Sequence, residues 1–144
     1  MLVSTIGFTR RDAREFFELL QASGAKRILD VRLNSTSQLA GFSKRNDLAY
    51  FANVIASIDY VPVPALAPTK EILRGYRAGE LTWEEYEVRY IDLISERKVE
   101  QVLARELIDG GCLLCSELGP ERCHRRLAVE YLQGFWPDLV AVHL

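Results

Sequence analysis

The residues that could carry chemistry gather near the end of the chain, between positions 112 and 126. This stretch contains all three cysteines and one of the two histidines. Its pattern predicts a strand over 111–116, then a loop, then a helix that begins at Pro120, a residue suited to a first helical turn. A thiol placed beside a helix amino terminus and among arginines is expected to ionise readily and to act as a nucleophile.

Four residues of this stretch are catalytic candidates. Cys115 lies at the exit of the expected strand and Cys123 falls in the expected first helical turn, so either could supply the thiolate. His124 continues an apolar helical stripe, which fits either a packed histidine with one hydrogen bond or a general acid or base. Glu117 either orients a substrate or pairs with a neighbouring arginine.

Cys112 and Cys115 have the Cys-x-x-Cys spacing found in metal and redox sites. Residues three apart on a strand point to opposite faces, so we expect Cys112 to be a small buried hydrophobic residue. A metal site made of Cys115, Cys123 and His124 is disfavoured, because adjacent helical residues diverge by about 100° and no fourth ligand is evident. We therefore predict neither a metal nor a cofactor.

A second group of polar residues is expected at the same edge of the sheet. Asp30 and Arg32 interrupt an apolar strand and need partners. They either pair with each other, or Arg32 helps to bind a phosphate or carboxylate. The candidate ligand-binding residues are Asp30, Arg32, Ser43, Lys44 and Arg125, together with the backbone amides at Gly7.

The hydrophobic pattern alternates between strands and helices along the whole chain. Strands are expected at 2–8, 27–33, 59–63, 111–116 and 139–144, and helices at 10–23 after a Thr9 cap, at 45–57, at 70–77, from 83 onward, at 99–108 and at 120–135. This alternation predicts one α/β domain over residues 1–144, with three layers and a mostly parallel five-stranded sheet. We expect the strand order 3-2-1-4-5, helices on both faces, and a ligand pocket at the carboxyl ends of the strands.

Composition excludes several classes of function. The chain has 144 residues and a formal net charge of -2, which gives no bulk attraction to nucleic acid or to membranes. No apolar run is long enough to span a bilayer, and the first residues lack the features of a secretory signal, so we expect a cytoplasmic protein. Three cysteines do not suggest a disulfide framework.

Several short motifs, taken in order, resemble the bacterial and archaeal family known as domain of unknown function 488. They are Thr5-Ile-Gly-Phe, Leu29-Asp-Val-Arg, Gly41-Phe-Ser-Lys, Tyr60-Val-Pro-Val, Leu113-Leu-Cys-Ser-Glu and Cys123-His-Arg. The resemblance implies a small α/β domain without an established reaction. Its motif residues would here be Asp30, Arg32, Ser43, Lys44, Cys115, Glu117, Cys123, His124 and Arg125. The chain departs from the family at 65–68, where Ala-Leu-Ala-Pro replaces an expected Leu-Gly-Gly.

The sequence thus favours a pocket that binds a small anionic ligand, such as a nucleotide or phosphorylated compound. Cys115 or Cys123 would act there as a thiolate, assisted by His124 and Glu117. One alternative is a non-catalytic module that binds nucleic acid or nucleotide, with arginines on the phosphates and thiols that only pack. Another is a redox or metal sensor in which Cys115 and Cys123 bridge on oxidation. Substrate identity and oligomeric state stay open.

Overall fold

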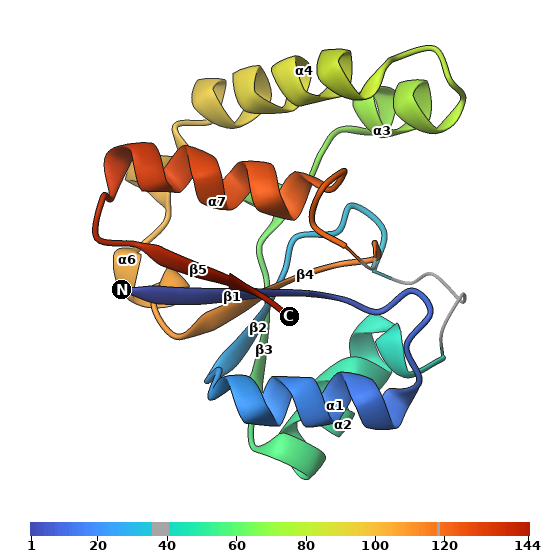
Figure 1. Ribbon diagram of the computed structural model, residues 1–144, viewed down its shortest axis with the longest axis vertical. Coiled ribbons are helices and arrows are strands. Elements are labelled where there is room, and N and C mark those ends of the chain that lie inside the picture. Colours follow the sequence, from blue (N-terminus) through green and yellow to red (C-terminus); the bar gives the residue numbers. More distant parts are fainter. Residues whose placement is uncertain (36–40, 118) are drawn as a thin grey trace.

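A five-stranded sheet forms the middle layer of the protein (Figure 1). The computed structural model describes residues 1–35, 41–117 and 119–144. All neighbouring strands pair in parallel, which confirms the predicted α/β fold. The strands are β1 (Leu2–Gly7), β2 (Arg27–Asp30), β3 (Asp59–Pro62), β4 (Gly111–Cys115) and β5 (Val140–His143).

The strand order is β3-β2-β4-β1-β5, so the expected order 3-2-1-4-5 is wrong. β4 lies between β2 and β1, and β5 pairs with β1 at the edge. β1 and β4 are both apolar and almost wholly buried, as suits strands covered on both faces, so their order depends on pairing between distant elements, whereas Val140 and Val142 of the edge strand β5 are exposed. As a consequence Cys115, at the end of β4, lies at the centre of the carboxyl edge.

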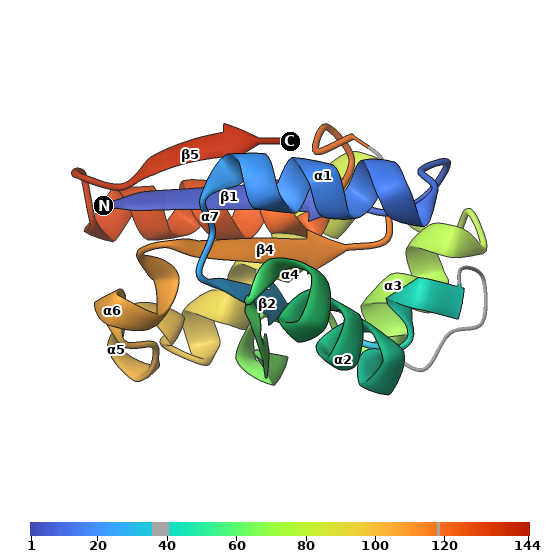
Figure 2. The same ribbon diagram turned by 90° about the horizontal axis from the view of Figure 1, so that it is seen from below.

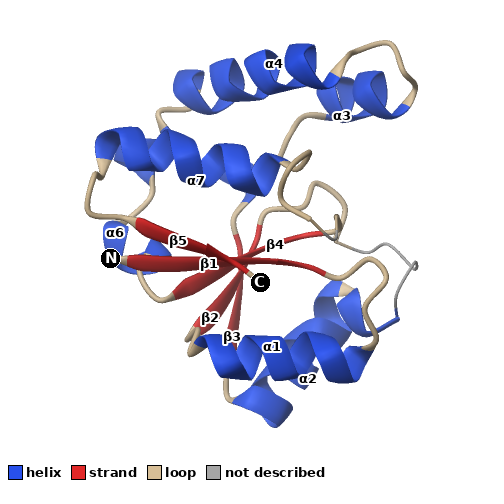
Figure 3. Ribbon diagram, in the orientation of Figure 1, coloured by secondary structure: helices blue, strands red, loops and turns tan. Residues whose placement is uncertain are grey.

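Helices cover both faces of the sheet. α1 and α2 lie on one face, and α4 and α7 lie on the other (Figures 1 and 3). Seen from below, α1 and α2 stand in front of the strands (Figure 2). The helices are α1 (Ala13–Ser23), α2 (Arg45–Ala56), α3 (Lys70–Arg77), α4 (Trp83–Glu96), α5 (Val99–Val102), α6 (Arg105–Ile108) and α7 (His124–Phe135), with 3-10 turns η1 (Gly41–Ser43) and η2 (Pro64–Leu66).

The side chains of β4 alternate between two apolar cores. Leu113 packs into the cluster under α4 and α7, whereas Cys112 and Leu114 belong to the cluster under α1 and α2. Cys112 is therefore a buried core residue, as predicted. Burial raises the pKa of its thiol to about 12, so it stays protonated and unreactive near neutral pH.

Two helix starts differ from the predicted ones. The side chain of Asp12 caps α1 by accepting the backbone N–H of Glu15 at 2.8 Å. Thr9, the predicted cap, instead donates its N–H and its hydroxyl to the Ser116 carbonyl, which joins the end of β1 to the loop after β4. The predicted helix over 99–108 is two short helices, α5 and α6.

The start of the last helix, α7, also differs from the predicted one, and this difference affects the site. α7 begins at His124 rather than at Pro120, and Cys123 is its N-cap residue, with extended backbone angles of φ −139° and ψ 139°. α4 begins with a capping box, in which Thr82 and Glu85 bond to each other's backbone N–H. Across the described ranges, none of the helices has the length and apolar character needed to cross a membrane.

Candidate active site

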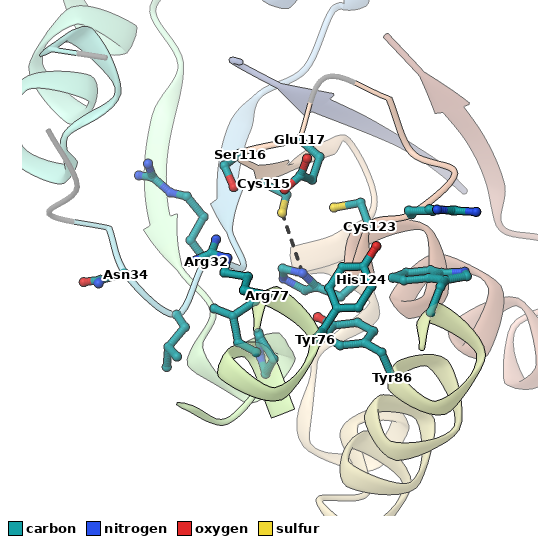
Figure 4. Close-up of a pocket in the computed structure, with 15 residues that line it drawn as sticks. Arg32, Asn34, Tyr76, Arg77, Tyr86, Cys115, Ser116, Glu117, Cys123 and His124 are labelled. Atoms are coloured by element: carbon teal, nitrogen blue, oxygen red, sulfur yellow. Dashed lines mark hydrogen bonds between the residues drawn. The ribbon is translucent and has the colours of Figure 1, made fainter. Parts of the chain in front are cut away.

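A cavity of about 190 Å³ lies at the carboxyl ends of β2 and β4, beside the end of α3 and the first turns of α4 and α7. Its wall includes Cys115, Cys123 and His124, three of the predicted catalytic residues (Figure 4). Glu117, the fourth, also lines the cavity, through an exposed side chain. The structure therefore brings all four together at the carboxyl edge of the sheet.

Cys115 and His124 form a buried pair. The Cys115 Sγ lies 3.6 Å from Nδ1 of His124, and Nε2 of the same ring lies 2.8 Å from the carbonyl oxygen of Val31. A carbonyl oxygen can only accept a hydrogen bond, so Nε2 carries a proton and Nδ1 of the neutral ring faces the thiol as an acceptor. A thiol whose base is itself held by a third group is the arrangement of activated cysteine nucleophiles.

Neighbouring groups favour the ionised form of Cys115. A hydrogen bond from the Cys123 thiol, then the charge and hydrogen bond of His124, hold the pKa of Cys115 well below its usual value despite burial. Burial and the adjacent Cys115 sulfur raise the pKa of Cys123 instead. Burial disfavours the imidazolium, but the charge and hydrogen bond of Cys115 and the hydrogen bond to Val31 together outweigh it and raise the pKa of His124. These shifts favour transfer of the Cys115 proton to His124, with Cys123 as a neutral thiol beside the pair.

Cys123 lies closer to this pair than the sequence predicted. The helical geometry that we expected would have turned Cys123 away from His124, and this expectation is wrong because Cys123 precedes the helix in extended conformation. The Cys115 Sγ, the Cys123 Sγ and a ring nitrogen of His124 all lie within 4.8 Å of one another. These three atoms are close enough to hold one metal ion.

An aromatic wall lines the opposite side of the cavity. Tyr76 from α3 and Trp83 and Tyr86 from α4 line it, and the Trp83 and Tyr86 rings stack with centroids 5.1 Å apart and planes 19° apart. Trp83 and Tyr86 stand three residues apart in the helix expected from residue 83, a spacing typical of one inward-facing stripe. It could not show that this stripe covers the site, because that depends on how α3 and α4 pack onto the sheet.

Two exposed arginines stand at the rim of the cavity. Arg77 ends α3, and Arg122 lies in the loop before α7. Arg122 is one of the arginines expected around the thiols, whereas nothing in the sequence pointed to Arg77. Together they outnumber the Glu117 carboxylate in the cavity wall, so this opening carries a local positive charge that the net charge of the chain does not reveal.

Asp30 and Arg32 pair with each other, one of the two alternatives that the sequence left open. Nε of Arg32 donates to Oδ1 of Asp30 and Nη2 donates to Oδ2, each at 2.8 Å, and the Tyr60 hydroxyl donates to the same carboxylate. Both side chains are almost fully buried. Arg32 lines the cavity, whereas Asp30 supports it from behind.

The other predicted ligand-binding residues lie outside the wall of this cavity. Ser43 is buried at the end of η1, and Lys44 is the N-cap residue of α2. Arg125 is fully buried, and its Nη1 donates to the Glu117 carbonyl oxygen, against which Gly7 also packs. Gly7 and Arg125 thus brace the loop that follows β4. A direct contact of these four residues with a ligand stays a prediction.

The fold and the site define a small doubly wound α/β domain with a cysteine–histidine pair at the carboxyl edge of its sheet. The model of a family described as "Domain of unknown function DUF488" matches residues 12–132. The match spans most of the chain, which therefore belongs to this family, as its motifs predicted. Comparison with curated proteins gives no match, and comparison with solved structures gives none.

Proposed function

We propose that the protein is a thiol-dependent enzyme in which Cys115 attacks a small anionic substrate. The observation that carries this proposal is the geometry of the cysteine–histidine pair. Nδ1 of His124 lies 3.6 Å from the Cys115 Sγ, and the ring is fixed from behind by Val31. Both residues line a cavity that a substrate could enter. A residue that only packs would need neither the oriented base nor the opening.

The proposed reaction begins when the Cys115 proton moves to Nδ1 of His124. The sulfur then forms a bond to the electrophilic atom of the substrate, and the bond to the leaving group breaks. The imidazolium of His124 returns its proton to that leaving group. Water, deprotonated by the same ring, then takes the transferred group from the sulfur, and the Cys115 thiol is restored.

The size and charge of the cavity support a small anionic substrate. Its volume of about 190 Å³ is below the roughly 300–1,000 Å³ typical of sites that enclose drug-sized ligands. A small molecule, or the reacting end of a larger one, would therefore fit. Arg77 and Arg122 at the rim would draw an anion toward Cys115, and the aromatic wall would pack against its apolar part.

Two alkylating reagents of similar size test the anionic preference, because iodoacetate is negatively charged and iodoacetamide is neutral. We expect the metal-free, reduced protein to react at Cys115 faster with iodoacetate, although a thiolate in free solution repels it. Arg122→Gln or Arg77→Gln should lower the iodoacetate rate by about fivefold, since one charge near the site contributes about 1 kcal/mol. The iodoacetamide rate should not change.

The matched control is Arg14→Gln, which removes a charge from an exposed side chain of α1 on the opposite face of the sheet. It should leave both rates as they are. If iodoacetamide is the faster reagent and neither rim variant alters the ratio of the two rates, the cavity has no preference for anions. That part of the proposal would then be wrong.

A further inference from the structure

Three atoms that could bind a metal converge beside the cavity: Sγ of Cys115, Sγ of Cys123 and a ring nitrogen of His124. All three residues are buried, and the atoms lie within 4.8 Å of one another. In a tetrahedral zinc site, bonds of about 2.3 Å to sulfur and about 2.0 Å to nitrogen place the two ligand atoms roughly 3.5 Å apart. The distance from the Cys115 Sγ to Nδ1 of His124 is 3.6 Å. This pair already has the spacing of two ligands on one zinc ion.

The surroundings orient the same atoms. Histidines that bind metals donate their second ring N–H to a carbonyl or carboxylate, which fixes the ring and its tautomer. Here Nε2 of His124 lies 2.8 Å from the Val31 carbonyl oxygen, which leaves the Nδ1 lone pair facing the sulfurs. Cys123 is an N-cap residue without a side-chain capping bond, and Figure 4 shows its sulfur beside that of Cys115.

We propose that a soft divalent cation, with zinc as the best fit, binds Cys115, Cys123 and His124 and holds the thiol site in an inhibited state. The inhibitory meaning rests on the proposed function, because the ion would occupy the sulfur that attacks the substrate. Three protein ligands leave a fourth position for water or an anion from the cavity, as in catalytic zinc sites and unlike closed structural ones.

Charge and protons balance in this step. The reduced group of two thiols and one neutral imidazole holds two titratable protons. Zinc forms one bond to each sulfur and one to Nδ1, and both protons pass to solvent. Two thiolates cancel the two positive charges of the ion, so no net charge is buried. Magnesium and calcium prefer oxygen ligands, so neither should compete for this site.

Metal titration of the reduced, metal-free protein tests the inference. One equivalent of Co²⁺ should give the visible absorption of a tetrahedral ion together with a thiolate charge-transfer band, and Zn²⁺ should displace it. Zn²⁺ should also protect Cys115 from iodoacetamide, whereas Mg²⁺ should not. Loss of a residue that only hydrogen-bonds to a metal-ligating side chain typically weakens metal binding by about 10–100-fold. We therefore expect Cys123→Ala, which removes a ligand itself, to weaken Zn²⁺ binding by more than about 100-fold.

The matched control is Cys112→Ala, which removes a thiol from the opposite core and should bind Zn²⁺ as the native chain does. The inference is overturned if no one-to-one complex forms, or if Cys123→Ala binds Zn²⁺ as tightly as Cys112→Ala. If either outcome is found but Cys115 is alkylated rapidly in the metal-free protein, the metal site is refuted and the proposed function stays in place. Zinc binding that depends on Cys123, with an unactivated Cys115 in the metal-free protein, would instead refute the proposed function and retain the metal site.

Discussion

Gly7→Ala is expected to destabilise the protein by more than about 3 kcal/mol. A Cβ at this position would lie 1.4 Å from the Glu117 carbonyl oxygen and 2.7 Å from Nη1 of Arg125. Both neighbours are anchored, since Arg125 is fully buried and bonds to that same carbonyl. Gly7 also pairs in register with Cys115, so relief of the clash would move the loop that begins at the thiol. Urea denaturation followed by circular dichroism measures the loss.

Gly134→Ala provides the control for this substitution. Gly134 is exposed in α7, and an added Cβ would meet nothing within 4 Å. Alanine stabilises a helix by about 1 kcal/mol relative to glycine, so this variant should be slightly more stable than the native chain. Equal denaturation midpoints for Gly7→Ala and the native chain would show that the close packing around Gly7 is not required.

Asp30→Ala is expected to cost about 3–5 kcal/mol of unfolding free energy, because it leaves a buried guanidinium without its carboxylate. The Asp30 and Arg32 side chains are 1% and 4% exposed, so water cannot replace the lost partner. The Tyr60 hydroxyl would lose its acceptor as well. Urea denaturation followed by circular dichroism measures this loss as well. The alkylation rate of Cys115 reports whether the cavity keeps its shape.

An exposed ion pair of the same residue types serves for comparison. Arg105 and Asp138 are 44% and 55% exposed and meet at 2.7 Å. Exposed pairs contribute about 0–1 kcal/mol, so Asp138→Ala should have only a small effect. If Asp30→Ala and Asp138→Ala destabilise the protein equally, burial of the Asp30 pair does not stabilise this edge of the sheet.

Local patterns in the sequence predicted most helices and strands, since apolar spacing reflects which face of an element is buried. They could not predict the strand order, because β1 and β4 are both apolar and their places depend on contacts between distant elements. The predicted position of Cys123 was wrong for a local reason. Pro120 is a strong helix-start signal, yet the chain makes another turn and begins α7 at His124.

The candidate site also has a part that the sequence predicted and a part that it could not. Cys115, Glu117, Cys123 and His124 were found because reactive residue types are concentrated in one short stretch. The aromatic wall and Arg77 come from α3 and α4, far away in sequence, whereas Arg122 belongs to the same stretch as the thiols. Nothing about Arg77, for example, distinguishes it from a solvated surface charge until the two helices are packed against the sheet.

The central claim is that His124 activates Cys115, and alkylation of each cysteine, located by peptide mapping, tests it most directly. In metal-free, reduced protein near neutral pH, Cys115 should react first and Cys112 should stay unmodified. His124→Gln, checked for folding by its denaturation midpoint, should slow Cys115 by at least about 100-fold, the usual contribution of a positioned base. A native Cys115 that reacts no faster than a cysteine in the unfolded chain, or a rate that His124→Gln leaves unchanged, would contradict the claim.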